Sequence, residues 1–305
     1  MAAIVAGAGQ ALAAPGTSTT PTSPTTPTSP TRPATPTLPS IGIPAVDGLL
    51  DKLAGNGSTA PGTTSSDTSQ MIVVTAPRAS DTTATLTAFD KGADKTWKPA
   101  FGPTKAFLGS QGMGEPKDNV PRTPEGTFAL DQAFGREANP GTKMPYCQAT
   151  RQDWWDSNMK SPTYNTHVRQ PQSPGGDSEN LYKIGEVYDY AVNIAHNPQR
   201  TPGKASAMFL HVTNGEPTQG CVAIDRELMK KILVWLDPAK HPKITIGVNK
   251  GTPTDETANT PGTTTTSPDD KTGILGADNP LTGLLNQLVN IIPALLGTSA
   301  GSSAG

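Results

Sequence analysis

"FLHVTNGEPTQGCVAID", residues 209–225, carries one histidine and one cysteine, His211 and Cys221, separated by a connection that contains glycine and proline. The run that leads into it, "SAMFLHV" (206–212), is short and apolar, which predicts a buried strand. The run that follows the cysteine, "DRELMKKILVWLD" (225–237), has helical spacing and opens on an aspartate suited to an N-cap. The stretch therefore predicts a strand, a connection long enough to turn back beside it, and one helix directly after the cysteine.

The rest of the central region is dominated by β-forming runs. Five further segments have the composition of strands, at residues 70–76, 84–90, 126–130, 188–195 and 243–248. Residues 70–248 are therefore predicted to be one mainly β domain, which at roughly 180 residues is large enough to bury a core.

The two ends of the chain differ from this domain in composition. Residues 15–69 and 249–272 are rich in Thr, Pro and Ser, and they are predicted to be disordered linkers because so little apolar surface cannot offset the ordering entropy. Residues 1–14 resemble the last part of a secretory signal without its positive region, which favours an exported protein. Residues 273–305 form a leucine-rich C-terminal segment.

Two short amphipathic segments, 41–53 and 279–297, flank the central domain. Both have leucines at helical spacing, so each is expected to have an apolar face that needs a partner. Two interpretations are open: the segments pack on each other or on the domain, or they dock on an envelope surface or a second protein. Neither segment reaches the roughly 20 apolar residues of a membrane-spanning helix.

The charge of the chain excludes one class of partner. The formal net charge is −2 and no basic cluster occurs, so the composition does not indicate a nucleic-acid-binding protein.

The two cysteines admit two interpretations. A free thiol has a pKa of about 8.5, so a nucleophilic cysteine needs a base such as His211 to take its proton. Alternatively, in an exported protein, Cys147 and Cys221 form a disulfide. The cysteine spacing gives no zinc ligand set, and His167 is predicted to lie in a loop.

The residues around Cys221 resemble the catalytic core of the L,D-transpeptidases, the YkuD-like family of bacterial cell-wall enzymes. That family has a His on one strand and, further on, a Ser/Thr-x-Gly-Cys segment, which His211 and "TQGC" ending at Cys221 match. The segment "RTPEGTFAL" (122–130) is similar to the family's Thr-Pro-x-Gly-x-Phe segment. The chain departs from the pattern at Gln219, where His is common, and at Ala223, where Arg or Asn is common.

The resemblance implies a YkuD-like mixed β-sandwich in which Cys221 is the nucleophile and His211 the base. The N–H groups of Gly220 and Cys221 would form the oxyanion hole. The implied substrates are peptidoglycan stem peptides, which form a thioester with the enzyme and then a cross-link in the cell wall or periplasmic space. The pattern does not identify the substrate-binding residues, and the implied chemistry needs no metal or cofactor.

Two alternatives to cross-linking stay open. Water in place of an amine would make the same fold an L,D-carboxypeptidase or endopeptidase. A rival of another class is a non-catalytic wall-associated protein with a Cys147–Cys221 disulfide.

Overall fold

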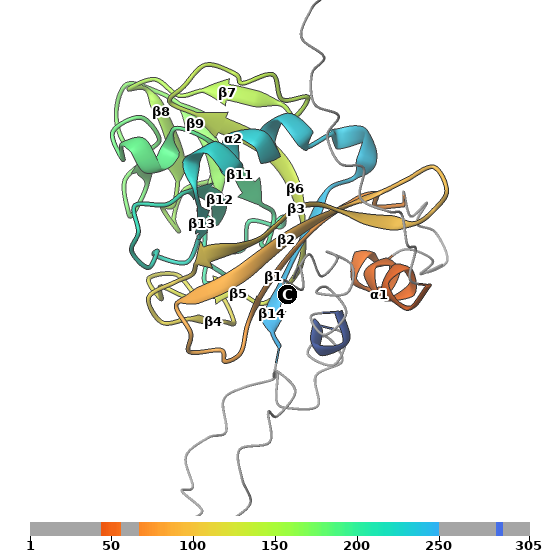
Figure 1. Ribbon diagram of the computed structural model, residues 1–305. Coiled ribbons are helices and arrows are strands. Elements are labelled where there is room, and N and C mark those ends of the chain that lie inside the picture. Colours follow the sequence, from red (N-terminus) through yellow and green to blue (C-terminus); the bar gives the residue numbers. More distant parts are fainter. Residues whose placement is uncertain (1–43, 56–66, 250–284, 289–305) are drawn as a thin grey trace, which may run out of the picture. The chain divides into compact units, whose positions relative to one another are not determined.

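The computed structural model of the protein describes residues 44–55, 67–249 and 285–288 (Figure 1). Its main element is a nine-stranded sheet with the order β11-β12-β13-β3-β2-β1-β14-β6-β7. The strands of this sheet are β1 Gln70–Ala76, β2 Thr83–Lys91, β3 Trp97–Phe107, β6 Gly126–Gly135, β7 Tyr146–Gln148, β11 Ala191–Ile194, β12 Phe209–Val212, β13 Val222–Ile224 and β14 Lys243–Val248. Because β11 also pairs with β6, the sheet closes on itself like a barrel.

Smaller elements complete the described part of the chain. A three-stranded sheet with the order β10-β8-β9 lies near β7 (Figure 1). The remaining elements are β8 Asp153–Asp156, β9 Thr166–Arg169, β10 Glu179–Asn180, the short pair β4 Met113–Gly114 and β5 Thr123–Pro124, the helices α1 Pro44–Ala54 and α2 Arg226–Trp235, and the 3-10 turns η1 Glu186–Tyr188 and η2 Pro238–Lys240.

The central strand β1 is buried on both faces, since all seven of its residues are buried. Ile72 and Val74 point into the main core, where Met229 and Ile232 of α2 also pack. Met71 and Val73 point to a second core. The alternation expected of a strand therefore directs successive side chains into two different hydrophobic clusters.

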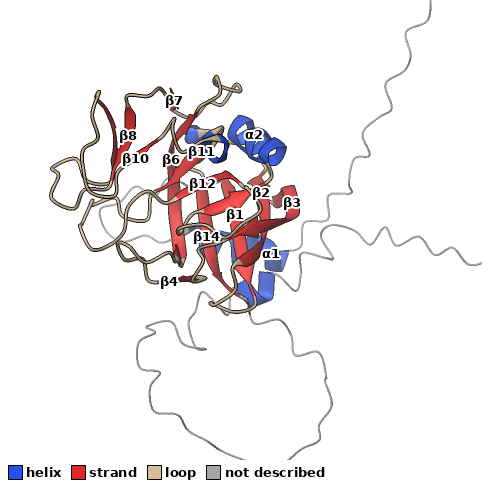
Figure 2. Cartoon of the chain, turned by 90° about the vertical axis from the view of Figure 1, so that its left-hand side faces the viewer, coloured by secondary structure: helices blue, strands red, loops and turns tan. Residues whose placement is uncertain are grey.

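Helix α1 covers the second of these clusters. Leu49, Leu50 and Leu53 pack with Phe89 and Trp97, and Figure 2 shows α1 beside the strands β1 and β3. Polar contacts fix the helix in register: Asp47 Oδ1 accepts from the backbone N–H of Trp97 at 2.6 Å, and Asp51 Oδ1 accepts from its indole N–H at 3.0 Å.

The apolar faces of the two flanking segments thus find a partner within the chain, as far as their residues are described. Residues 285–288 are helical, and Leu285 and Leu288 are buried in the cluster that α1 covers. The apolar face of α1 is occupied in the same way, so the interpretation in which these segments pack on the domain holds for the described residues. Within the predicted linkers the structure describes only residues 44–55, 67–69 and 249. The other linker residues, the signal-like start and the rest of 279–297 lie outside the described residues.

Several predicted elements are confirmed and several boundaries were wrong. The strands at 70–76 and 243–248 and the helix after the cysteine occur as predicted, with Asp225 Oδ1 accepting from Glu227 N and Leu228 N. The strand predicted at 206–212 begins only at Phe209, and Tyr188 belongs to η1 rather than to a strand. The mainly β fold class is confirmed.

Strand β3 was not predicted at all. Its sequence, "WKPAFGPTKAF", contains two prolines and a glycine, residues that normally exclude a strand interior. The strand accommodates them through two irregularities in its pairing with β2, near Ala88. None of the helices among the described residues is long and apolar enough to cross a bilayer.

Candidate active site

His211 and Cys221 are brought together by two parallel strands. In the pairing of β12 with β13, His211 lies opposite Ala223 and Leu210 opposite Val222. Cys221, one residue before β13, lies level with Phe209, whose backbone N–H contacts its sulfur at 3.3 Å. Phe209 and His211 are two residues apart on β12, so their side chains share a face of the sheet. Because Cys221 is level with Phe209, its thiol lies on the same face as the imidazole.

The connection 213–221 is held firmly where it returns to the sheet. Thr218 N donates to Leu108 O at 2.8 Å, and Thr218 Oγ1 donates to the carbonyl of Cys221 at 2.7 Å. The hydroxyl of Thr123 also donates to the Cys221 carbonyl at 3.3 Å. Thr123 is fully buried. The segment 122–130, singled out by resemblance, therefore supports the cysteine through one buried threonine.

Gly220 is required by the close packing beside the cysteine. Its φ of +132° is disfavoured for other residues, and a Cβ there would lie 2.7 Å from Met208 Cε. Its N–H donates to Thr218 Oγ1 at 3.1 Å. A substrate oxyanion would compete with that hydroxyl, so the role of Gly220 in an oxyanion hole stays a prediction.

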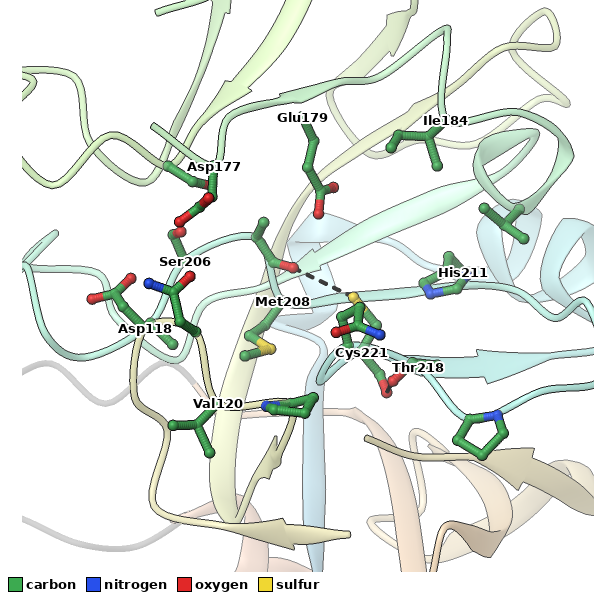
Figure 3. A pocket seen from close by; sticks show the side chains of 18 of the residues that line it. Asp118, Val120, Asp177, Glu179, Ile184, Ser206, Met208, His211, Thr218 and Cys221 are labelled. Carbon is green, nitrogen blue, oxygen red and sulfur yellow. Dashed lines mark hydrogen bonds between the residues drawn. The ribbon is translucent and has the colours of Figure 1, made fainter. Parts of the chain in front are cut away.

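The thiol of Cys221 is buried and protonated. Burial, with a smaller contribution from the charge of Glu179, raises the pKa of this thiol well above its ordinary value. Its S–H donates to the carbonyl of Ala207 at 3.4 Å, which Figure 3 shows as a dashed line. The cysteine is therefore a neutral thiol at neutral pH and needs a base to become a nucleophile.

His211 has the tautomer that such a base requires. Its Nδ1 lies 2.8 Å from the carbonyl of Val212, and since a carbonyl only accepts, Nδ1 carries the hydrogen. Burial lowers the pKa of His211 to about 4, although the carbonyls of Val212 and Val187 oppose the shift. The ring is thus neutral at pH 7, with the lone pair on Nε2. A backbone carbonyl, that of Val212, orients it.

Both side chains line one cavity of about 580 Å³. Figure 3 shows the imidazole beside the sulfur on the same wall of this cavity. Among the hydrogen bonds of the described residues none joins Cys221 Sγ to the ring of His211; the thiol is directed to Ala207 instead. Nucleophile–base contacts of this kind often form only when substrate binds.

Two further residues of the cavity were missed in the sequence analysis. Glu179, at the start of β10, accepts a hydrogen bond from the hydroxyl of Tyr188. The Tyr188 ring packs edge-on against His211, with ring centroids 5.5 Å apart. Neither residue stands in a recognisable motif, and only the tertiary fold places them beside Cys221.

Cys147 belongs to a second group of residues with nucleophilic character. Its sulfur lies 3.7 Å from His167 Nε2, which lies 2.7 Å from Asp153 Oδ1. These are the residue types of a catalytic Cys–His–Asp site. Both cysteines are free thiols, so the alternative interpretation, a Cys147–Cys221 disulfide, is wrong. The predicted loop position of His167 is also wrong, because it lies on β9.

The contacts within this second group limit its chemistry. The same ring nitrogen of His167 faces both the sulfur and the carboxylate, so when Nε2–H donates to Asp153 it cannot take the proton of Cys147. Burial and the charge of Asp153 raise the pKa of the Cys147 thiol, against the opposing effect of Arg169.

The same group was not anticipated as a metal site, because the sequence shows no ligand spacing. The sulfur, carboxylate and imidazole atoms lie within 4.8 Å of one another. Arg169 already pairs with both carboxylate oxygens of Asp153: its Nε lies 2.8 Å from Oδ1 and its Nη2 lies 3.1 Å from Oδ2. Because a guanidinium stands where a cation would bind, the group fits a metal ion poorly.

The sequence matches the model of a known protein family. The family model YkuD, described as the L,D-transpeptidase catalytic domain, matches residues 76–264. The matched range contains both cysteines and covers more than half of the chain. No curated protein matches the sequence.

Proposed function

Because this chain belongs to the YkuD family of L,D-transpeptidase catalytic domains, we propose that it cross-links peptidoglycan stem peptides through a thioester on Cys221. The observation that carries the proposal is the neutral pair in one cavity: a buried thiol and an imidazole whose Nδ1 is held by a carbonyl, leaving Nε2 to accept a proton. This arrangement fits general-base activation of a cysteine.

The first half of the proposed reaction forms the acyl-enzyme. Nε2 of His211 takes the proton of the Cys221 thiol as the sulfur bonds to the carbonyl carbon on the L-centre side of the scissile bond. The tetrahedral intermediate then collapses with cleavage of the C–N bond. The departing D-amino acid takes the proton from His211, and the acyl group stays on the sulfur as a thioester.

The second half transfers the acyl group to an amine of a neighbouring stem. The neutral amine attacks the thioester carbonyl and passes a proton to Nε2 of His211. As the C–S bond breaks, the sulfur recovers that proton and the free thiol is restored. Water in place of the amine gives a hydrolysed stem, the product of an L,D-carboxypeptidase.

The composition of the N-terminal residues supports export as the setting of this reaction. The signal-like residues 1–14 are followed by a Thr/Pro-rich stretch, as in proteins that reach the cell wall or periplasmic space. Fusing residues 1–69 to a reporter that folds only outside the cytoplasm tests this part of the proposal.

To test the reaction, the protein is incubated with a stem tetrapeptide, with and without an acceptor stem, and the products are identified by mass spectrometry. A cross-linked product from the parent and from Cys147→Ser, with none from Cys221→Ser, is the expected result. The two variants make the same chemical change at the two free thiols, so each controls for the other. Loss of product in Cys147→Ser but not in Cys221→Ser would show that Cys147, not Cys221, is the nucleophile. Formation of hydrolysed product without cross-linked product would favour the carboxypeptidase.

A further inference from the structure

Glu179 is a carboxylate in the cavity of Cys221 that has no cationic partner among the described residues. Its Oε2 accepts from the hydroxyl of Tyr188, and no ion pair involves it in the described part of the chain. Asp118, in the same cavity, differs: its two oxygens accept from Tyr164 Oη and Gly203 N, each at 2.6 Å. Glu179 therefore has one oxygen, Oε1, to which no described residue donates a hydrogen bond.

The surroundings of this carboxylate favour a cation. Glu179 is half-buried, and burial raises the pKa of its carboxyl, although the hydrogen bond from Tyr188 opposes the shift. A carboxylate removed from water is stabilised by an opposite charge or by a proton. Figure 3 shows the Glu179 side chain pointing into the cavity toward the level of Cys221, so a cation that paired with it would have to enter the cavity.

The position of Glu179 relative to the sulfur identifies which cation this is. Its charge is close enough to contribute to the raised pKa of Cys221, after burial. An acceptor amine must bring its nitrogen to the carbonyl carbon bonded to that sulfur. The donor nitrogen on that carbon is an uncharged amide until the C–N bond breaks, whereas the acceptor nitrogen enters as an ammonium. The acceptor nitrogen is thus the cation that the reaction itself brings to the sulfur near Glu179.

We propose that Glu179 binds the ammonium group of the acceptor stem and so directs the thioester toward an amine rather than toward water. This inference rests on the proposed function and assigns the acceptor side of the same cavity. Loss of one proton from the ammonium to the free carboxylate oxygen leaves a neutral amine beside the thioester, and the carboxyl gives that proton to water once the product has left. Tyr188 acts as a positioning residue, because it holds the other carboxylate oxygen and packs against His211.

The variant Glu179→Gln tests the proposal, because it keeps the shape and the acceptor oxygen but removes the charge. Two rates are measured separately: acylation of Cys221 by a donor tetrapeptide without acceptor, and transfer to increasing concentrations of an acceptor stem. We expect acylation within about threefold of the parent and a KM for the acceptor raised at least about tenfold, since a desolvated charge pair is lost. The ratio of cross-linked to hydrolysed product falls accordingly.

Hydroxylamine, which is uncharged at neutral pH, supplies the control on the nucleophile. Glu179→Gln should react with hydroxylamine at the rate of the parent, because no ammonium has to be bound. Asp177→Asn supplies the matched control on the protein: Asp177 lines the same cavity but is exposed, and its loss of charge should leave the KM for the acceptor unchanged.

Three results would overturn the proposal. The first is an unchanged KM for the acceptor in Glu179→Gln. The second is an equal loss with hydroxylamine and with the ammonium acceptor, and the third is the same loss in Asp177→Asn. Absence of a thioester on Cys221 in the parent would instead refute the proposed function, so the two failures are distinguishable.

Discussion

At the scale of single residues, the proposed chemistry depends on a thiol and an imidazole that are both uncharged. Burial raises the pKa of Cys221 and lowers that of His211 to about 4, so each shift opposes an ion pair in the resting protein. Proton transfer therefore has to accompany attack on the substrate rather than precede it. A resting thiolate is not available for reaction with other electrophiles.

The pH dependence of acylation follows from this pair. The active form has His211 neutral, and since its pKa is about 4, kcat/KM for acylation should be level from about pH 5 to about pH 8 and fall only as the ring is protonated near its own pKa. Burial lowers this pKa, so acid removes activity at a lower pH than for an exposed histidine. Acylation by a donor tetrapeptide, followed by mass across that range, measures it.

An acid limb near the ordinary histidine pKa of about 6.5 would contradict this prediction. The proposal of a neutral pair would also be contradicted by rapid alkylation of Cys221 by iodoacetamide at neutral pH, because only a thiolate reacts rapidly. The Cys147→Ser variant removes the second thiol from that measurement.

At the scale of elements, two parallel strands and an N-terminal helix determine how the site is built and supported. β12 sends Leu210 and Val212 into the main core and Phe209 into a separate aromatic cluster. In that cluster Phe209 packs edge-on against Trp155 with centroids 4.9 Å apart. The same alternation directs His211 to the cavity, so the position of the proposed base follows from the packing of its strand.

Helix α1 packs on the sheet through buried leucines, so shortening one of them should lower the free energy of unfolding. Leu50 is fully buried against the sheet, so Leu50→Ala should lower the free energy of unfolding by about 2–5 kcal/mol. Urea unfolding followed by tryptophan fluorescence measures this, because Trp97 packs in the same cluster.

The exposed residue Lys52 of the same helix supplies the control, since Lys52→Ala keeps helical propensity and removes no buried surface. An unfolding free energy unchanged by Leu50→Ala would show that α1 does not stabilise the sheet.

Sequence patterns predicted those elements whose own residues carry the signal. The apolar run of β1, the alternation within β11 and the capped helix α2 all occur close to where they were expected. β3 could not be predicted, because its prolines and glycine are tolerated only through irregular pairing with β2. Such pairing depends on a partner strand elsewhere in the sequence.

Of the candidate site, only the proximity of two residues could be predicted from the sequence. His211 and Cys221 could be paired because they flank one short connection, which the parallel strands then close. Glu179, Tyr188 and the group around Cys147 could not be found, because segments far apart in sequence bring them together. Local propensity carries no information on contacts of that kind.

At the scale of the whole described domain, closure of the main sheet brings two free thiols into one region. Cys221 and Cys147 both pack on the cluster around Phe134 and Phe209, yet they open into different cavities. One cavity offers a histidine whose Nδ1 is held by a backbone carbonyl. The other offers a histidine and a carboxylate that are already hydrogen-bonded to each other. The fold thus makes the two cysteines chemically unequal.

The most direct measurement of this inequality is to trap the acyl-enzyme with a carbapenem and map the adduct by peptide mass spectrometry. We expect one adduct, on the peptide that contains Cys221, in the parent and in Cys147→Ser, and none in Cys221→Ser. An adduct on the peptide that contains Cys147, persisting in Cys221→Ser, would contradict it.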